Sequence, residues 1–286
     1  WGWYALFRAA QLKNQMGLMM EAADPDGWKG PLRWVKYSTL QILLGQRVHF
    51  VLGMGMLGVR WFTHCGFSQE KVFPFGYFVE DCDDYDLTLR AGSEKTFHIL
   101  FVGQLVQLKR VDLLIRALSR LPLDAIRLSI AGNGPERACL EGLARELSVE
   151  RYIDWLGALS NQQVRKLMAE ADLLVLPSRY DGWGAVVNEA LMAGTPVICT
   201  DYCGAADLLG EDWRGEVVPR NNVDALAAAI KRRMERRPVT QQSREEIRKW
   251  SECISGRSAA LYLQGVIEHV YNHYPKPVPP WQKRER

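Results

Sequence analysis

The sequence predicts an α/β fold whose larger part is a doubly wound parallel sheet. From Phe97 onward, short runs rich in β-formers alternate with amphipathic helical runs, which is the pattern of repeated βαβ units. Apolar residues make up 48% of the 286-residue chain, enough to build a substantial core. We therefore expect a folded protein rather than a disordered one.

Three strands and their helices form the first half of the predicted sheet. After the first strand, apolar residues between 111 and 121 fall on one helical face. The second strand is followed by a Gly-rich turn and a helix with Pro135 at its first position. A capping box of Ser160 and Gln163 starts the third helix. The three strands are residues 98–103, 126–131 and 152–156.

The second half of the sheet is predicted from three further apolar runs. A helix between the first two of them ends at Gly194, a residue type that commonly terminates helices. A last helix covers residues 223–234. The strands are residues 173–176, 196–200 and 215–219, which brings the sheet to about six strands.

The first 90 residues are expected to form only part of a second α/β domain. They contain a helical run at 36–44, a buried strand at 48–52 and a helix at 59–64, and an acidic linker at 80–86 follows. The chain begins without Met or a signal segment, so we expect an N-terminally truncated fragment. The predicted domains are residues 1–90, 91–255 and 256–286, the last being a crossover helix with a disordered, basic and proline-rich tail.

Composition excludes several classes of protein. The net charge is only +3 with both signs interspersed, so nucleic acid is not an expected partner. Six cysteines without CxxC pairs indicate reduced thiols of a cytoplasmic protein rather than a metal site. The most apolar stretch, residues 48–59, is about twelve residues long, whereas a membrane-spanning helix needs about twenty.

The most informative stretch is residues 178–194, which joins a strand to a helix. Gly182 and Gly184 let the backbone approach a ligand, and the first amides of the helix, from Ala185, favour a diphosphate. Glu189 lies about five residues into the helix, roughly 7 Å along its axis, which suits a ribose on the same ligand. Asp181 could accept hydrogen bonds from hexose hydroxyls. The alternative is that both acids are solvated or cap the helix.

Two other loops follow strand ends. Lys109, in the loop after Gly103, could neutralise a diphosphate as a mobile point charge, or could simply face solvent. Leu156 and Gly157 end the third strand, where Leu156 could equally be core. The turn at residues 132–134 lacks the third glycine and the later acid of a dinucleotide fingerprint, so we interpret it as a tight turn.

Residues 181–189, two acids with seven residues between them, resemble the signature of glycosyltransferase family four. The similarity extends through residues 101–105, 131–137, 173–178 and 194–198, and so covers nearly all of residues 97–235. It implies a GT-B architecture of two Rossmann-like domains. It also implies transfer of a hexose-type sugar, with retained configuration, from a nucleotide-diphosphate donor to a glycan, lipid or small-molecule acceptor, as in polysaccharide biosynthesis.

The resemblance also implies roles for individual residues. Asp181 contacts the donor sugar and Lys109 the leaving diphosphate as catalytic residues, while Glu189 holds the ribose and the strand end at Leu156 and Gly157 meets the base. Asp181 stands where Glu is usual. No metal or further cofactor is expected. The remaining donor-binding positions are Gly103, Gln104, Gly182, Trp183, Gly184 and Ala185.

Gln104 also departs from the family pattern, because it stands where Arg is usual, and Arg110 is a candidate to replace the missing charge. Three other functions stay open: a noncatalytic nucleotide-sugar-binding module, a nucleotide-sugar epimerase and an NAD-dependent oxidoreductase. The epimerase needs acid and base residues that these loops do not offer. Basic residues at 231–237 and 283–286 could associate with the anionic inner face of a membrane that bears a lipid-linked acceptor, or could be ordinary solvated helix charge.

Overall fold

The computed structural model describes residues 16–78, 96–236 and 239–283. The chain forms two compact units. Unit 1 spans residues 1–77 together with 257–286, and unit 2 spans residues 78–256. The predicted acidic linker and the predicted boundary near residue 90 lie outside the described residues.

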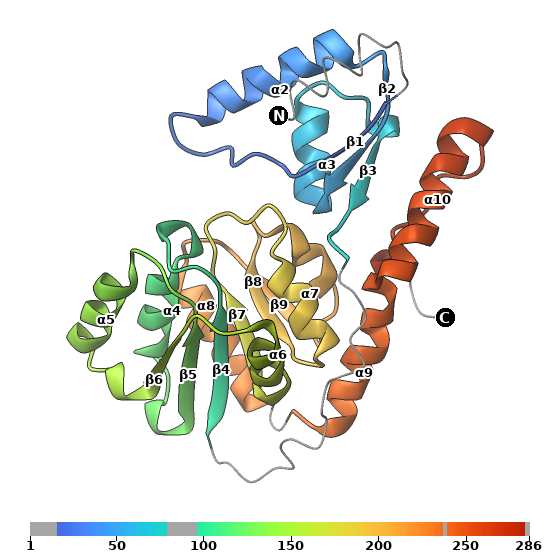
Figure 1. Ribbon diagram of the computed structural model, residues 1–286. Helices are drawn as coiled ribbons and strands as arrows, with labels where there is room; N and C mark the ends of the chain where they lie inside the picture. The colour runs from blue at the N-terminus through green and yellow to red at the C-terminus, as the bar shows by residue number, and fades with distance from the viewer. Residues whose placement is uncertain (1–15, 79–95, 237–238, 284–286) are drawn as a thin grey trace. The chain divides into compact units, whose positions relative to one another are not determined.

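Unit 2 is built on a six-stranded parallel sheet with the order β6-β5-β4-β7-β8-β9 (Figure 1). The chain builds the sheet outward from β4 in one direction and then from β7 in the other, so the winding reverses between β4 and β7. This order confirms the predicted doubly wound sheet. The strands are β4 (Phe97–Val102), β5 (Ile126–Ala131), β6 (Ile153–Gly157), β7 (Leu173–Leu176), β8 (Val197–Thr200) and β9 (Gly215–Val218).

Helices cover both faces of this sheet, which is why its strands are continuous apolar runs. Ile99, Leu100 and Leu174, for example, are fully buried in the two central strands. Helices α4, α5 and α8 pack together on one face, and α6, α7 and α9 on the other (Figure 1). Their bounds are α4 (Val111–Leu118), α5 (Arg137–Glu146), α6 (Asn161–Glu170), α7 (Ala185–Met192), α8 (Val223–Glu235) and α9 (Gln241–Ser251).

The ends of these helices follow the predicted signals with one exception. The Ser160 capping box is present, and Gly194 adopts a left-handed φ of 79° just after α7. The expected start at Pro135 is wrong, because α5 begins at Arg137. The reason is that the Glu136 amide donates to the carbonyl of Leu105, 3.0 Å away in the loop after β4, so this stretch belongs to a loop contact and not to a helix.

Unit 1 contains a parallel three-stranded sheet with the order β1-β2-β3. The predicted strand at 48–52 and helices at 36–44 and 59–64 fall within β2, α2 and α3. A Cβ on Gly53 would lie 2.8 Å from the backbone of Gly58, so glycine lets α3 pack directly on β2. The elements are β1 (Met16–Met20), α2 (Gly30–Leu44), β2 (Val48–Met54), α3 (Gly55–His64) and β3 (Val72–Phe75), joined by α10 (Gly256–Asn272).

The proline-rich segment after α10 is ordered up to Lys283, so the predicted disorder is wrong for residues 273–283. Trp281 is buried and packs edge-on against Tyr262 with ring centroids 6.2 Å apart. Lys276 donates to the carbonyl of Gln69 at 3.1 Å. Burial of a large indole offsets the entropy of ordering the segment. Among the described residues, no helix is both long and apolar enough to cross a membrane.

Candidate functional site

Lys109 and Asp181 meet where the winding of the unit 2 sheet reverses. Lys109 ends a short 3-10 turn after β4, and Asp181 lies in the loop after β7. The Lys109 Nζ donates to the Asp181 Oδ2 at 2.5 Å, and both side chains are part-buried. Ligands of doubly wound sheets bind beyond the carboxyl ends of the strands at this reversal point. The structure thus brings together two residues that are 72 positions apart.

Backbone hydrogen bonds fix the loop that carries Asp181. The Arg179 amide donates to the carbonyl of Leu108 at 2.9 Å, which ties this loop to the one after β4. The Asp181 amide donates to the carbonyl of Tyr202 at 2.9 Å, and the Asp181 carbonyl accepts from the Gly204 amide at 3.0 Å. Asp181 is therefore held on both sides by neighbouring loops, and its carboxylate is positioned before any ligand binds.

Gly184 caps the start of α7 in a conformation that suits glycine alone. Its φ is 89°, and a Cβ there would lie 2.7 Å from the Cys203 Sγ and 3.0 Å from a methyl carbon of Leu176. Gly182 beside it is also buried. Ala185 opens α7, and the first amides of a helix have no partner within the helix. The start of α7 therefore lies directly after the buried glycine turn, at the place where the sequence predicts an anion-binding helix terminus.

Trp183 supports this turn and does not offer its ring to a ligand. The side chain is only 1% exposed, and its Nε1 donates to the Asn188 Oδ1 at 2.8 Å. Its carbonyl accepts from the Cys203 Sγ at 2.9 Å. Burial behind the turn leaves the backbone of Trp183 as the part that could contact a ligand, and the expectation that Trp183 binds donor stays a prediction.

Glu189 is the fifth residue of α7, as the sequence predicts, and is part-buried. Burial raises the pKa of its carboxyl above the ordinary value of 4.5, and the charge of Arg165 on α6 opposes that rise. A carboxylate with little hydration gains from hydroxyl donors that replace the missing water. A part-buried carboxylate of this kind can accept hydrogen bonds from the hydroxyl groups of a ligand.

Glycines join the loops after β4, β5 and β6. The Gly103 amide donates to the carbonyl of Ala131 at 3.0 Å, and the Gly132 amide to that of Gly157 at 2.7 Å. A Cβ on Gly132 would lie 1.8 Å from the Gly103 carbonyl oxygen. Such close approach explains residues 132–134 as a tight turn, as predicted. Leu156 is 37% exposed, so the interpretation of this residue as core is wrong.

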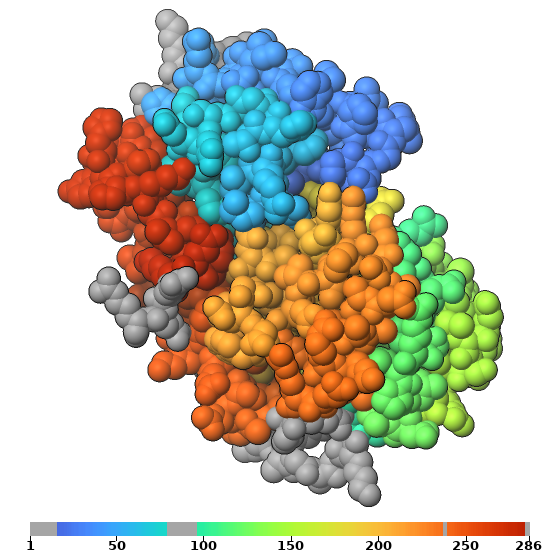
Figure 2. All heavy atoms as spheres, turned by 180° about the vertical axis from the view of Figure 1, so that it is seen from behind, coloured from blue at the N-terminus to red at the C-terminus, as the bar shows by residue number. Residues whose placement is uncertain are grey.

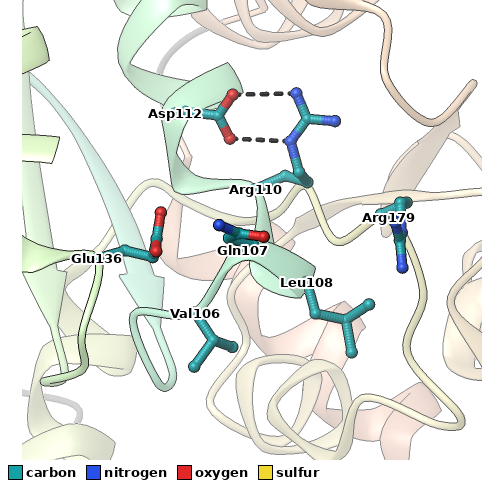
Figure 3. A pocket seen from close by; sticks show the side chains of 7 residues that line it. All are labelled: Val106, Gln107, Leu108, Arg110, Asp112, Glu136 and Arg179. Carbon is teal, nitrogen blue, oxygen red and sulfur yellow. Dashed lines mark hydrogen bonds and ion pairs between the residues drawn. The ribbon is translucent and has the colours of Figure 1, made fainter. Parts of the chain in front are cut away.

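A pocket of about 570 Å³ lies in unit 2, and Leu108 and Arg110, the sequence neighbours of Lys109, are part of its lining (Figure 3). The loops after β4, β5 and β7 contribute its walls, and its volume lies within the roughly 300–1,000 Å³ typical of small-molecule sites. Its lining consists of Val106, Gln107, Leu108, Arg110, Asp112, Glu136 and Arg179.

Sequence reasoning missed Glu136 and Arg179 as parts of this region. Both lie in loops that follow strands, Glu136 five residues after β5 and Arg179 three residues after β7, and this position was an available signal. Attention in these loops went instead to the glycines and to the acids of the motif. Arg110, the candidate to replace the charge that Gln104 lacks, is already paired with a neighbouring carboxylate. Its guanidinium binds both oxygens of Asp112, at 2.9 and 3.0 Å (Figure 3), whereas Gln104 is exposed and neutral. Within the described ranges, no cluster of three or more His, Cys, Asp or Glu residues could hold a metal ion.

Comparison with known proteins decides the family. The sequence model of the family described as "Glycosyl transferases group 1" matches residues 90–250, more than half of the chain. The chain belongs to the group 1 glycosyltransferases. This is a family of transferases, and the matched segment contains Lys109, Asp181 and Glu189.

Two individual relatives are also glycosyltransferases by name. An uncharacterized glycosyltransferase of Methanocaldococcus jannaschii is 36% identical over 135 residues, which are 47% of this chain and 35% of that protein. N-acetylgalactosamine-N,N'-diacetylbacillosaminyl-diphospho-undecaprenol 4-alpha-N-acetylgalactosaminyltransferase of Campylobacter jejuni is 31% identical over 172 residues, which are 58% of this chain and 46% of that protein. The chain thus spans between a third and a half of these curated relatives.

Solved structures show the same architecture. The crystal structure of Anabaena HepE in complex with UDP has a TM-score of 0.76 to this chain at 17% identity. The match covers 92% of this chain and 75% of that one. A crystal structure of the apo lipopolysaccharide outer core galactosyltransferase WaaB gives a TM-score of 0.71 at 17% identity, covering 93% and 78% of the two chains. The predicted α/β fold of GT-B type is confirmed.

Proposed function

We propose that the chain carries the donor site of a retaining, family-four glycosyltransferase that moves a hexose-type sugar from a nucleotide diphosphate to an acceptor. The observation that carries the proposal is the Lys109–Asp181 ion pair, which lies at the reversal point of the sheet in the loop that leads into α7. The Lys109 cation and the start of α7 match a diphosphate. The carboxylates of Asp181 and Glu189 match the hydroxyl groups of the hexose and of the ribose, so together these groups fit a nucleotide sugar. The UDP in the related Anabaena structure supports the donor class.

Each part of the site has a role in this proposal. The Lys109 ammonium has three donors, so it can keep Asp181 and also bind the diphosphate. The first amides of α7 add donors to the same phosphates. Asp181 accepts from hexose hydroxyls and Glu189 from the ribose, while the backbone at Leu156 and Gly157 meets the base.

The proposed reaction needs no group beyond the two substrates. The bond between the anomeric carbon and the diphosphate oxygen breaks, and its electron pair leaves with the diphosphate. The acceptor hydroxyl oxygen bonds to the anomeric carbon on the same face, and its proton passes to the departing phosphate oxygen. Lys109 and the α7 amides stabilise the charge on the leaving group, and Asp181 orients the sugar.

The remaining features of the proposal concern the partners. The acceptor is a glycan, a lipid-linked sugar or a small molecule, as the range of relatives suggests. Five reduced cysteines among the described residues fit a cytoplasmic compartment, at the side of the membrane where a lipid-linked acceptor would be met. Gln104 provides a neutral contact where the family usually has an arginine, so we expect weaker diphosphate binding than in its relatives.

Isothermal titration calorimetry with UDP, GDP, ADP, their hexose conjugates and NAD tests the proposal. We expect saturable binding of one nucleotide diphosphate. Lys109→Ala and Glu189→Ala should each weaken it about 10- to 100-fold, because each removes a charged hydrogen-bonding group. Asp181→Asn keeps the shape but loses the charge, so it should weaken the sugar conjugate far more than the bare diphosphate.

Three results would count against this assignment. Binding of NAD alone would favour an oxidoreductase, and nucleotide binding unaffected by all three substitutions would place the site elsewhere. Donor binding by the full-length protein without sugar transfer to any acceptor would favour the noncatalytic nucleotide-sugar-binding module.

A further inference from the structure

Arg110 directly follows Lys109 and has a backbone conformation that is unusual for its residue type. Its φ is 51° and its ψ is 41°, in the left-handed region that favours glycine. Among the described residues, the non-glycine residues with a positive φ are Arg110, Ser148, Asn221 and His273. A left-handed arginine is strained, because its Cβ crowds the backbone. The conformation therefore persists only where surrounding contacts hold it.

The Arg110 guanidinium makes such contacts on two sides. Its Nε donates to the Oδ1 of Asp112 at 2.9 Å, and its Nη2 donates to the Oδ2 of the same carboxylate at 3.0 Å (Figure 3). A two-point contact of this kind fixes the direction of the guanidinium as well as its position. Its Nη1 donates to the Oδ1 of Asn221, three residues after the end of β9. Arg110 thus links the start of α4 to the loop after β9.

The two segments that Arg110 joins lead into helices that pack together. The surfaces of α4, in green, and α8, in orange, adjoin in the space-filling view (Figure 2). Arg110 is the N-cap residue of α4. Asn221, whose φ is 57°, directly precedes Asn222, the N-cap residue of α8. The hydrogen bond between the two left-handed residues therefore ties the starts of two neighbouring helices to each other.

The turn that ends at Lys109 is held by this link. In the 3-10 turn after β4, the Lys109 amide donates to the carbonyl of Val106 at 2.9 Å, and the Arg110 amide donates to that of Gln107 at 3.3 Å. The backbone of Arg110 closes the turn, so a guanidinium fixed on two sides leaves the preceding residue little freedom. The Lys109 Nζ leaves this turn and reaches the Oδ2 of Asp181 at 2.5 Å.

We propose that Arg110 is a positioning residue that aims Lys109 at the diphosphate of the donor. The inference rests on the proposed role of Lys109 in binding that diphosphate. Three of the five N–H groups of the guanidinium are engaged by Asp112 and Asn221, so Arg110 acts through the turn. A turn that is held before binding lowers the entropy cost of aligning the ammonium. Direct contact with the diphosphate, in place of the charge that Gln104 lacks, is the competing role.

A double-mutant cycle tests the proposal by calorimetry, with whichever of UDP, GDP and ADP binds most tightly. Arg110→Gly should weaken binding about 5- to 10-fold, because the turn must then be ordered during binding. In the Lys109→Ala protein the same change should cost less than about twofold, since no ammonium is left to aim. Asp112→Asn keeps the shape of one partner without its charge and should also weaken binding. Arg120→Gln, at an exposed ion pair with Asp224 of α8, is the matched control and should change nothing.

NMR of the lysine ammonium groups provides a second readout that needs no ligand. The ammonium held by Asp181 should give a slowly exchanging signal that is absent from Lys109→Ala. Arg110→Gly should broaden this signal, whereas Arg120→Gln should leave it unchanged. Glycine adopts a φ of 51° without strain, so we expect Arg110→Gly to fold, and circular dichroism checks this. Should it fail to fold, Asp112→Asn is the deciding variant.

Two results would overturn the positioning role of Arg110 alone. The first is a loss of affinity that is equally large with and without Lys109, because Arg110 would then contact the diphosphate itself. The second is an Arg110→Gly protein whose affinity and Lys109 signal both equal those of the wild type. Full affinity in Lys109→Ala would instead remove Lys109 from the donor site, and the positioning role would fail together with that part of the proposed function.

Discussion

Lys109 and Asp181 are held in place by contacts within the protein itself. Each charge is part-buried, and each is balanced by the other at 2.5 Å. Backbone hydrogen bonds on both sides of Asp181 hold its loop, so a donor would find the carboxylate already in place. Preorganisation of this kind lowers the entropy that binding must overcome.

Replacing Glu189 by Gln should make the protein more stable at pH 7 and lower its affinity for the donor. Its folded-state pKa is raised by burial, so ionisation costs the folded protein stability. Below pH 4.5 the group is protonated in both states and the cost is absent. As pH rises through the raised pKa, the wild type loses this stability. Glu189→Gln should therefore stabilise the protein at pH 7 by no more than about 1 kcal/mol, since solvent still screens the carboxylate.

Urea unfolding at pH 4 and pH 7 measures this difference, and titration with the preferred nucleotide measures binding. We expect the gain in stability at pH 7 to vanish at pH 4, while donor affinity falls because Gln offers no charge to the ribose hydroxyls. Asp154→Asn, at an exposed pair with Arg127 on another strand, is a control that should not alter donor affinity. A variant that binds donor as well as the wild type does would remove Glu189 from the site.

At the scale of elements, the turn into α7 depends on Gly184. Gly184→Ala should destabilise unit 2 by at least about 1–3 kcal/mol, because alanine is strained at a φ of 89° and its Cβ would press on Cys203 and Leu176. The same change should weaken nucleotide binding by moving the first amides of α7. Chemical denaturation and calorimetry on the same variant provide both quantities.

Gly142→Ala is the matched control for this prediction. Gly142 lies inside α5, and a Cβ there would meet nothing within 4 Å, so alanine should stabilise the protein by about 0.5–1 kcal/mol. If both glycine variants had equal stability, the strain at Gly184 would be absent, and the account of the turn would be wrong.

The elements of unit 2 could be predicted from the sequence because parallel strands covered on both faces appear as unbroken apolar runs. The predicted bounds of β5 and β7 agree with the structure. In unit 1, β1 (Met16–Met20) and β3 (Val72–Phe75) were missed, since the first has glycine and methionine at its exposed positions rather than polar residues and the second contains Pro74. Propensity and periodicity carry little signal in such short strands, which pairing with β2 stabilises.

The candidate site was predictable in its residues but not in its contacts. Glycines before a helix and two spaced acids are local signals, so Gly184, Asp181 and Glu189 could be selected. The Lys109–Asp181 contact depends on β4 lying beside β7, and nothing in either segment encodes that neighbour. Trp183 lies within the motif, yet its side chain is buried behind the turn and packs in the core. In both cases the position of the residue in the folded chain, which the local sequence does not give, determines its contacts.

At the scale of the whole molecule, the chain contains two cores with separate contributions to stability. The core of unit 2 surrounds the six-stranded sheet, and the core of unit 1 includes the segment after α10 through Trp281. All the proposed donor contacts lie in unit 2. Stability of the two units should therefore respond to different perturbations.

Chemical denaturation followed by circular dichroism should show two transitions that can be shifted independently. Trp281→Ala should lower only the transition of unit 1, by about 3–5 kcal/mol, because it removes a buried indole. The preferred nucleotide diphosphate at a hundred times its Kd should raise only the other transition, by about 2.7 kcal/mol. If the ligand instead raised only the unit 1 transition, which Trp281→Ala lowers, the donor site would not lie in unit 2. A single transition shifted by both would mean that the units unfold as one, so that ligand binding stabilises both cores at once.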